Sequence, residues 1–348
     1  MLAISTRIST RRWRCEAAVD HRIIGMTIAH NATAGVAPGV AALDIHGLTK
    51  GFTASDGERF RAVDGIDLTV RPGEVVAFLG PNGAGKSTTI DMILGLTQPD
   101  DGAVQVFGLP PAEAVRSGRV AAVLQTGGLL PDLTVQGTVE LIASLFPGAD
   151  AEDAIRRAGL DELRQRKVSK CSGGQQQSLR FALALLPKPD LLILDEPTAG
   201  MDVDARRRFW ADVRADAQKG TTVLFATHYL EEADHFADRV VMVARGRVVA
   251  DGTTADVRAR TSGRSVSAVL SRADADAALR ALPGTRVSEI RGDRTVFITD
   301  QRANSGAATS DDLLRFLLTQ TGARELEAAS LGLEDVFVQL TADREAAR

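Results

Sequence analysis

The stretch Gly80–Thr88 reads GPNGAGKST and fits the phosphate-binding loop pattern G-x-x-x-x-G-K-[ST]. Glycines let the backbone curl so that consecutive N–H groups point at phosphate oxygens, which a Cβ would obstruct. The lysine of this pattern reaches the β- and γ-phosphates, and the next hydroxyl is a ligand for Mg²⁺. The loop therefore predicts a nucleoside triphosphate site formed by Gly80, Pro81, Asn82, Gly83, Ala84, Gly85, Lys86, Ser87 and Thr88.

The segments on both sides of this loop have the structure that the pattern requires. Glu74–Leu79 (EVVAFL) is a short apolar run after the turn residues Pro72-Gly73, which is typical of a buried strand. Thr89–Leu96 (TIDMILGL) carries apolar residues at helical spacing. A strand that enters the loop and a helix that leaves it distinguish a phosphate site from a glycine-rich turn that happens to contain Lys-Ser.

Composition indicates an ordinary soluble α/β protein with free thiols. A chain of 348 residues, 44% of them apolar, is long enough for two domains and a sizeable core. Lys and Arg number 41 against 45 Asp and Glu, which argues against a general role in binding nucleic acid. Cys15 and Cys171 lie too far apart in sequence for metal-ligand spacing. The apolar run Leu179–Leu186 contains Arg180 and is much shorter than the ~18–20 residues of a membrane-spanning helix.

The chain is predicted to begin with a tail, followed by an ATP-binding α/β domain at residues 43–262. Residues 1–42 carry arginines followed by small residues and lack the apolar region of a signal peptide, so we expect disorder, with Met26 as an alternative start. Strands are expected at Leu43–Leu48 and Ile66–Val70, with a polar loop at Thr53–Arg61. A helical pattern at about 126–186 interrupts the later strands and predicts an inserted subdomain.

Residues 265–348 are predicted to form a small accessory domain. Strand-like and helical segments follow one another in the order β-α-β-β-α-β, with Gly292-Asp293 as a hairpin turn between the second and third strands. This order is that of the ferredoxin-like fold. A final helix is expected in LEDVFVQLT, at Leu333–Thr341.

Four further signals follow the phosphate loop in a fixed order. They are Gln125 at the end of a predicted strand, CSGGQ at Cys171–Gln175, LLILDEP at Leu191–Pro197, and His228 after the apolar run Thr221–Thr227. Asp195 leaves a buried strand at the carboxyl edge of the sheet, where a carboxylate can hold Mg²⁺ directly or through water. Glu196 is one residue further, so strand alternation predicts that its carboxylate points the opposite way.

With these signals in place, the chain resembles the ATP-binding subunit of ABC transporters over residues 43–262. The resemblance implies a P-loop ATPase core with an inserted helical subdomain, which binds ATP and Mg²⁺. AGMDVDARRRFW at Ala199–Trp210 and LEDVFVQLT in the accessory domain resemble the drug-resistance branch of these exporters, of the daunorubicin-resistance type.

The resemblance also implies roles for individual residues. Glu196 would be the general base that polarises the attacking water, a group typically worth ~10²–10⁴ in rate. His228 would contact the γ-phosphate and sense hydrolysis, although a lone histidine is more often structural. Gln125 would be a ligand of Mg²⁺ or water and the hinge to the helical subdomain. The turn formed by Ser172, Gly173, Gly174 and Gln175 would complete the ATP site of a second subunit, so that two ATP molecules lie head to tail between two copies or paralogues.

Two assignments stay open at this point. Phe52 sits where the family places an aromatic residue that stacks on adenine, but core packing and Phe60 are rival interpretations. Asp202 lies in the loop that crosses the family's dimer interface, and a role as cap of the following helix is an equal alternative.

The chain departs from the family pattern at four positions. Cys171 stands where Leu usually begins the signature, Ser178 where Arg is common, and Met201 and Val203 replace a usual Leu and Pro. The cysteine is expected to lose apolar packing worth ~1 kcal/mol behind the signature turn.

The resulting prediction is an ATP-hydrolysing subunit at the cytoplasmic face of the membrane that powers a separate polytopic permease. The closer resemblance implies export of a drug or other hydrophobic compound. A soluble ABC-type ATPase acting on ribosomes or DNA is the alternative, although such proteins usually carry two cassettes or a long coiled-coil insertion. A small-molecule phosphotransferase is disfavoured by SGGQ and by the DEP-plus-His set.

Overall fold

The computed structural model describes residues 39–53, 57–125, 128–259, 263–300 and 308–330, together with Leu333, Val336 and Phe337. The predicted tail up to residue 38, with Cys15 and Met26, and most of the helix predicted at Leu333–Thr341 lie outside the described residues. Ala42, which the tail was predicted to include, is buried and its N–H donates to the carbonyl of Val70 at 2.8 Å.

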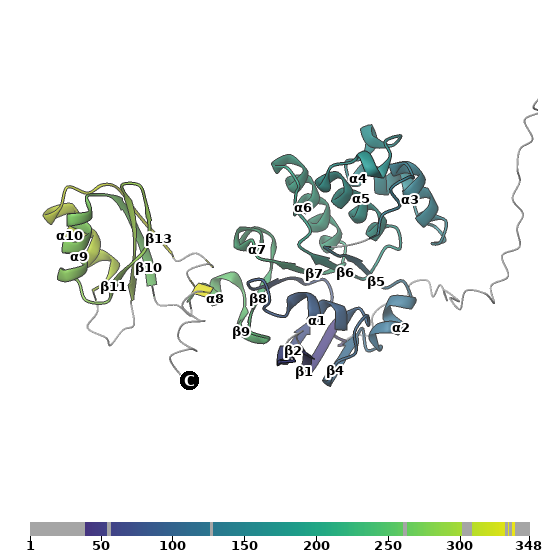
Figure 1. Ribbon diagram of the computed structural model, residues 1–348, viewed down its shortest axis with the longest axis horizontal. Helices are drawn as coiled ribbons and strands as arrows, with labels where there is room; N and C mark the ends of the chain where they lie inside the picture. Colours follow the sequence, from purple (N-terminus) through teal and green to yellow (C-terminus); the bar gives the residue numbers. More distant parts are fainter. Residues whose placement is uncertain are drawn as a thin grey trace, which may run out of the picture.

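A six-stranded sheet forms the centre of the part of the chain between residues 39 and 259 (Figure 1). Five neighbouring strands run parallel to one another. The sixth strand, at one edge of the sheet, pairs antiparallel with the fifth. The three central strands are buried along their whole length, as expected for unbroken apolar runs covered on both faces. In spatial order the strands are β5 (Val120–Val123), β6 (Leu191–Asp195), β7 (Thr222–Thr227), β3 (Val75–Leu79), β8 (Arg239–Ala244) and β9 (Arg247–Gly252).

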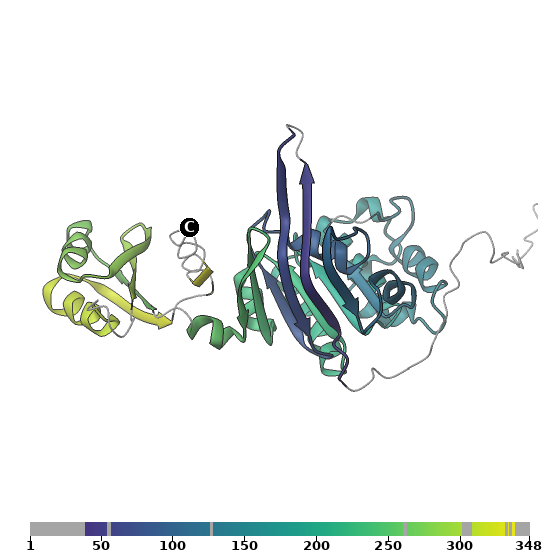
Figure 2. The ribbon, with the colours of Figure 1, turned by 90° about the horizontal axis from the view of Figure 1, so that it is seen from below.

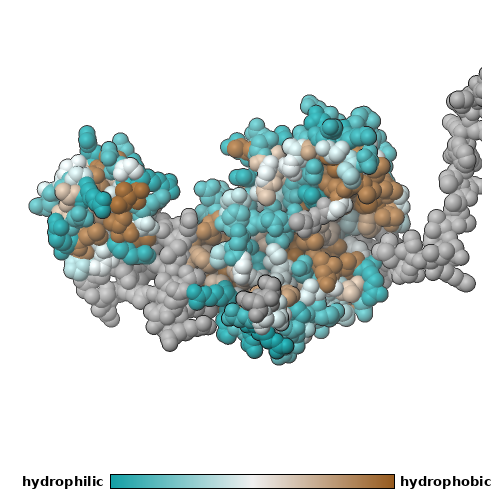
Figure 3. All heavy atoms as spheres, in the orientation of Figure 1, coloured by the Kyte–Doolittle hydropathy of each residue, from teal (hydrophilic) through white to brown (hydrophobic). Residues whose placement is uncertain are grey.

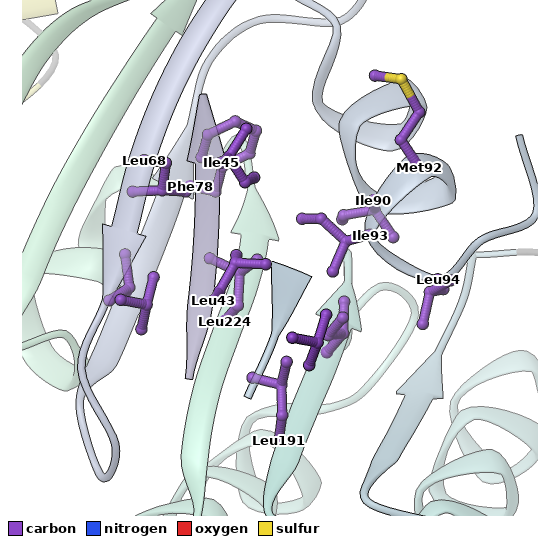
Figure 4. Close-up of a cluster of buried hydrophobic side chains, with 14 of the residues drawn as sticks. Leu43, Ile45, Leu68, Phe78, Ile90, Met92, Ile93, Leu94, Leu191 and Leu224 are labelled. Atoms are coloured by element: carbon purple, nitrogen blue, oxygen red, sulfur yellow. The ribbon is translucent and has the colours of Figure 1, made fainter. Parts of the chain in front are cut away.

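One face of this sheet packs against a three-stranded antiparallel sheet and two helices. The second sheet has the order β2 (Arg59–Val70), β1 (Leu43–Thr53), β4 (Asp101–Val106), and the helices are α1 (Lys86–Ile93) and α2 (Pro111–Arg116). Figure 4 shows the core between these layers, where Ile90 and Ile93 of α1 lie among leucines from β1, β6 and β7. The helix that follows the phosphate loop is thus anchored on its apolar face.

The prediction of a loop at Thr53–Arg61 was wrong at both ends, because Thr53 and the residues from Arg59 onward belong to strands, while residues 54–56 lie outside the described residues. Strand β1 continues to Thr53 and β2 starts at Arg59, so the two strands form a long hairpin that projects from the body of the domain (Figure 2). Its outer part is solvated on both sides, and therefore lacks the apolar alternation by which a half-buried strand is recognised in a sequence.

The other face of the central sheet is covered by helices, three of which contribute aromatic rings to a cluster around Phe209 and Trp210. They are α5 (Gly173–Leu185), α6 (Val203–Gln218) and α7 (Leu230–Phe236), with α8 (Thr254–Ala259) at the β9 edge. The Trp210 ring stacks on Phe236 at 4.7 Å and meets Phe225 of β7 edge-on at 4.7 Å. This aromatic cluster joins α6 and α7 to the strand that ends beside His228.

The predicted helical subdomain is present as a cluster with its own core. It contains α3 (Val135–Ala143), α4 (Ala151–Arg157) and the outer face of α5, and Val139, Ile155 and Leu179 are fully buried in it. Because Phe181 of the same α5 packs into the main core, α5 joins the subdomain to the central sheet.

The C-terminal part has the predicted ferredoxin-like order. Its elements are β10 (Gly263–Val269), α9 (Arg272–Ala281), β11 (Thr285–Arg291), β12 (Arg294–Asp300), α10 (Ser310–Gln320) and β13 (Arg324–Ser330). The antiparallel sheet has the spatial order β11-β12-β10-β13 and is covered by the two helices on one face. On its other face, Ile298 belongs to the same apolar cluster as Val257 of α8 and Val336.

None of the helices in the described ranges is long and apolar enough to cross a lipid bilayer.

Replacing Trp210 with Ala should destabilise the part of the chain built around the six-stranded sheet strongly. The side chain is 1% exposed and its removal would leave a large cavity among three phenylalanines. We expect a cost of about 3–5 kcal/mol and a melting temperature lowered by roughly 10 °C in thermal denaturation. Val203→Ala on the same helix is the control, because Val203 is 63% exposed and should lower the melting temperature little. Equal melting temperatures for the two variants would contradict this account of the core.

Candidate functional site

The phosphate loop is held between two neighbouring backbones that leave no room for side chains. A Cβ on Gly80 would lie 2.3 Å from the carbonyl oxygen of Val243, and one on Gly85 would lie 2.2 Å from that of Ala62. Gly85 also has φ 99°, which disfavours any other residue. The glycines that define the sequence pattern are therefore required by packing around the loop as well as by access of its N–H groups.

Lys86 is buried at the start of α1 and its ammonium group contacts the loop itself. Nζ donates to the carbonyl oxygens of Gly80 at 2.6 Å and Pro81 at 3.1 Å. Burial lowers the pKa of Lys86, while the nearby carboxylates of Glu196 and Asp195 raise it in opposition. Neutral carbonyl oxygens bind an ammonium group more weakly than charged oxygens do, so Lys86 is suited to replace these two partners with phosphate oxygens.

Asp195, the last residue of β6, lies beside the hydroxyl that follows Lys86. The Ser87 Oγ donates to Asp195 Oδ2 at 2.9 Å across 108 residues of sequence. Burial raises the pKa of Asp195, and the bond from Ser87 opposes that effect. A hydroxyl and a carboxylate of this kind fit Mg²⁺, which takes one or two protein oxygens and completes its shell with phosphates and water. In the described part of the chain no group of three or more His, Cys, Asp or Glu side chains could hold a metal alone.

Glu196 and His228 form a hydrogen-bonded pair at the ends of neighbouring strands. Glu196 Oε1 and His228 Nδ1 are 2.8 Å apart, and the other carboxylate oxygen, Oε2, is buried without a hydrogen-bond partner among the described residues. A buried carboxylate oxygen without a hydrogen bond costs folding free energy, and a water that donates to it would supply the missing bond. Tyr229 packs on the His228 ring at 4.0 Å, a contact that sequence reasoning did not anticipate.

The predicted opposite orientation of the Asp195 and Glu196 carboxylates was wrong. Both residues line one cavity with the phosphate loop. Glu196 follows the last residue of the strand and has φ 49°, so strand alternation no longer applies to it. A non-glycine residue in this left-handed region stores backbone strain, which is typical of functional positions.

A cavity of about 270 Å³ brings most of the predicted nucleotide-site residues together. Four predicted residues near this cavity do not line it, namely His228, Gly80, Pro81 and Ala84. Phe60 and Ala62 line it as well, and only the first of them was considered from the sequence. The predicted residues that line it are Phe52, Asn82, Gly83, Gly85, Lys86, Ser87, Thr88, Gln125, Asp195 and Glu196.

Phe52 and Phe60 are cross-strand partners on the projecting hairpin. Their ring centroids are 6.0 Å apart, and they are 42% and 52% exposed. Lys50 Nζ lies 5.9 Å from the Phe52 ring centroid and donates to Asp100 at 2.7 Å. Core packing therefore does not explain Phe52, and both rings are available to a planar group at this side of the cavity.

The turn formed by Ser172, Gly173, Gly174 and Gln175, here called the signature turn, lies away from this cavity, at the start of α5. Ser172 caps the helix by accepting from the Gln175 N–H at 3.2 Å, and its own N–H donates to Gln175 Oε1 at 3.0 Å. Ser172, Gly174 and Gln175 of this turn line a separate cavity of about 480 Å³ together with Gly200 and Asp202, whereas Gly173 does not line it. Asp202 caps α6 by accepting from Ala205 N–H at 2.7 Å, so the capping alternative is realised. Its role at a nucleotide stays a prediction.

Cys171 is a free thiol, 8% exposed, within the core of the helical subdomain. Burial raises its pKa, so the thiol stays neutral and behaves as a small apolar side chain. The weaker packing expected behind the turn stays a prediction, and the capping hydrogen bonds of Ser172 and Gln175 are in place.

Comparison with known proteins identifies the family to which the chain is similar. The family model described as "ABC transporter" matches residues 63–199. The chain is 34% identical to the daunorubicin/doxorubicin resistance ATP-binding protein of Streptomyces peucetius over 312 residues, covering 86% of this chain and 92% of that protein. It is also 34% identical to the Nod factor export ATP-binding protein I of Burkholderia lata, covering 87% of this chain and 97% of that protein.

Solved structures match the ATPase part. An ATP-binding subunit of an ABC transporter superposes with a TM-score of 0.57 at 30% identity, covering 63% of this chain and 92% of its own. A dimeric ATP-binding cassette in a post-hydrolysis state, bound to ADP and Pi, superposes with a TM-score of 0.56 at 27% identity, covering 61% of this chain and 98% of its own.

Replacing Asp195 with Asn should stabilise the ligand-free protein while impairing ATP hydrolysis. A carboxyl pKa raised by burial means that ionised Asp195 destabilises the fold at pH values above its unfolded pKa. Asn can still accept the bond from Ser87, so the variant should melt at a higher temperature at pH 7. The gain should shrink as the pH falls from the raised pKa of folded Asp195 toward the ordinary Asp pKa, and it should be absent below that value, where Asp195 is neutral in both states. Exposed Asp132→Asn serves as the control.

In the same Asp195→Asn variant, ATP hydrolysis with Mg²⁺ should fall at least about 10²-fold, because a neutral amide is a poor ligand for this cation. A variant that melts below wild type at pH 7 would contradict the electrostatic account of Asp195.

Proposed function

The chain belongs to the family of ABC transporter ATP-binding proteins, and from this we propose that it powers an exporter whose membrane-spanning part is a separate chain. Binding and hydrolysis of ATP follow from the family. The Glu196–His228 pair beside Lys86 and the Ser87–Asp195 pair is the observation that carries the assignment of residues. We divide the chain into an ATPase domain at 43–262 and an accessory domain at 265–348.

In the proposed reaction, water attacks the γ-phosphorus as the bond to the β-phosphate oxygen breaks. The loop N–H groups and Lys86 hold the β- and γ-phosphates and favour the charge that develops on them. Glu196 Oε2 accepts a hydrogen bond from the attacking water, while its Oε1 is held by His228. Ser87, Asp195 and Gln125 would hold Mg²⁺, which draws charge from the phosphate oxygens when bound. Phe52 and Phe60 stack on the adenine.

We propose that two chains combine so that Ser172 and Gly173 of each complete the ATP site of the other. The signature turn and the phosphate loop line separate cavities of one chain, so a site that uses both needs a second copy or a paralogue. The similar cassette bound to ADP and Pi is a dimer. Asp202 lies beside Ser172 in the same cavity and would face the partner's nucleotide.

A permease partner is supported by an apolar surface on the helical subdomain. Leu130, Leu141 and Leu145 are 53%, 48% and 55% exposed, and Figure 3 shows hydrophobic residues gathered over α3. Exposed leucines clustered on one face mark a contact site for another protein. The surface follows Gln125 in the chain, so nucleotide-dependent movement of Gln125 would be transmitted to it. The ATPase would then sit at the cytoplasmic face of the membrane.

The relatives favour export over the alternative of a soluble ATPase acting on ribosomes or DNA. Their names describe resistance to daunorubicin and doxorubicin and export of Nod factor. We propose a drug or other hydrophobic compound as the exported substrate.

Glu196→Gln should bind ATP yet hydrolyse it at least about 10²-fold more slowly, because the water loses its base. With ATP and Mg²⁺ it should elute as a dimer in gel filtration. Adding Gly173→Asp should prevent the dimer, since a carboxylate would then meet the partner's γ-phosphate. No described atom lies within 4 Å of a Cβ built on Gly173, so the single chain should fold and bind ATP normally.

Gln165→Glu, an exposed position in the same subdomain, adds one negative charge as the matched control and should leave the dimer intact. Dimers that persist in the Gly173→Asp variant would contradict the head-to-tail arrangement.

A tagged chain isolated from native membranes should recover a polytopic membrane protein. Leu141→Ser combined with Leu145→Ser should abolish that recovery, because the apolar contact is lost, while ATP binding and dimer formation persist. Ile290→Ser, which changes a 58% exposed side chain of the accessory domain, is the control and should retain the partner. Mass spectrometry of the recovered material checks the result, and recovery unchanged by the double substitution would rule out this docking surface.

A further inference from the structure

A buried carboxylate on α7 joins the two segments that carry Glu196 and His228. Glu232 is 4% exposed, and each of its carboxylate oxygens accepts a hydrogen bond from a different threonine hydroxyl. Thr198 donates to Oε1, and Thr227 donates to Oε2 at 3.2 Å. Both threonines are buried as well, at 1% and 0% exposure. Thr198 lies two residues after Glu196 and Thr227 lies one residue before His228.

Each threonine is tied in turn to the backbone beside the reactive side chains. Thr227 Oγ1 accepts from the Tyr229 N–H at 3.0 Å, which fixes the turn that carries His228. The Met201 N–H donates to the Thr198 carbonyl at 3.1 Å, which closes the turn that follows Glu196. The Glu232 carboxylate therefore bridges two turns whose side chains, Glu196 and His228, must meet at 2.8 Å.

Among the residues that the structure describes, Arg206 is the cationic side chain that lies beside the Glu232 carboxylate. Arg206 of α6 places Nε 3.7 Å from Glu232 Oε1, and its guanidinium lies 5.7 Å from the centre of the Tyr229 ring. Tyr229 itself packs on the His228 ring at 4.0 Å. Hydrogen bonds to a carboxylate in a buried site are stronger than those between neutral groups, so this bridge resists separation of the two turns.

We propose that Glu232 is a positioning residue that sets the Glu196–His228 distance through Thr198 and Thr227. It touches neither ATP nor water in this scheme. The inference rests on the roles proposed above for Glu196 and His228. Loss of the bridge would let the two turns drift apart, and a misplacement of about 1 Å at a reacting group can cost about 10² in rate.

The bridge is tested by steady-state hydrolysis normalised to nucleotide-binding sites, so that misfolded protein does not count. Glu232→Ala should lower kcat about 10- to 100-fold while KM for ATP changes less than about threefold, because the phosphate loop is untouched. Glu232→Gln should recover most of kcat, since an amide can accept from Thr198 and donate to Thr227. Glu231→Ala, the exposed neighbour on α7, is the matched control and should behave as wild type.

Thr227→Val and Thr198→Val keep the side-chain volume and remove one hydroxyl each, so they test the bridge if Glu232→Ala does not fold. Each should lower kcat and leave KM unchanged. A wild-type kcat per binding site in the folded bridge variants overturns the inference. Glu196→Gln, assayed in parallel, separates the two failures: if it hydrolyses ATP at the wild-type rate, the proposed roles of the pair are wrong. If it is inactive while the bridge variants are fully active, only the role of Glu232 is wrong.

Discussion

Parallel pairing of the central strands is the constraint on which the site depends. In the order β5-β6-β7-β3, every strand runs in the same direction, so four carboxyl ends meet at one edge of the sheet. The turns that leave these ends carry Gln125, Asp195 with Glu196, His228, and the phosphate loop. Residues 108 positions apart in sequence are thereby brought into hydrogen-bonding contact, as in the 2.9 Å bond from Ser87 to Asp195.

Burial of charge at this edge gives the site its electrostatic character. Lys86, Asp195 and Glu196 are 6%, 5% and 8% exposed, and desolvation pushes the pKa of Lys86 down and that of Asp195 up. Each shift favours the neutral form of a group that the proposed chemistry needs charged. A polyphosphate would supply negative charge to Lys86, and its cation would supply positive charge to Asp195. Ligand binding would therefore offset the free-energy cost of burying these two charged groups. The strained backbone of Glu196 adds to this cost.

Strands and helices that follow from a local sequence pattern could be predicted, whereas features that depend on tertiary packing could not. Unbroken apolar runs identified β3, β6 and β7, and apolar residues at helical spacing after the phosphate loop predicted α1, because both patterns report burial directly. The hairpin up to Thr53 was missed since its solvated strands carry no periodic signal. The orientation of Glu196 was missed because Glu196 lies just past the end of β6 with a left-handed backbone, to which strand alternation does not apply. The threonine partners of Glu232 could not be found either, since their hydrogen bonds join residues up to 34 positions apart.

Close backbone packing links the two cavities of one chain. A Cβ on Gly174 would lie 2.5 Å from the carbonyl oxygen of Gly200, so the start of α5 rests directly on the turn that follows Glu196. The same turn begins at Thr198, which Glu232 holds to the His228 segment. Movement at the Glu196–His228 pair therefore has a rigid path to the signature turn, without a flexible side chain in between. In a head-to-tail pair, a change at one chain's γ-phosphate would alter the surface that the same chain presents to the other nucleotide. Two sites joined in this way cannot respond independently, since each chain contributes to both.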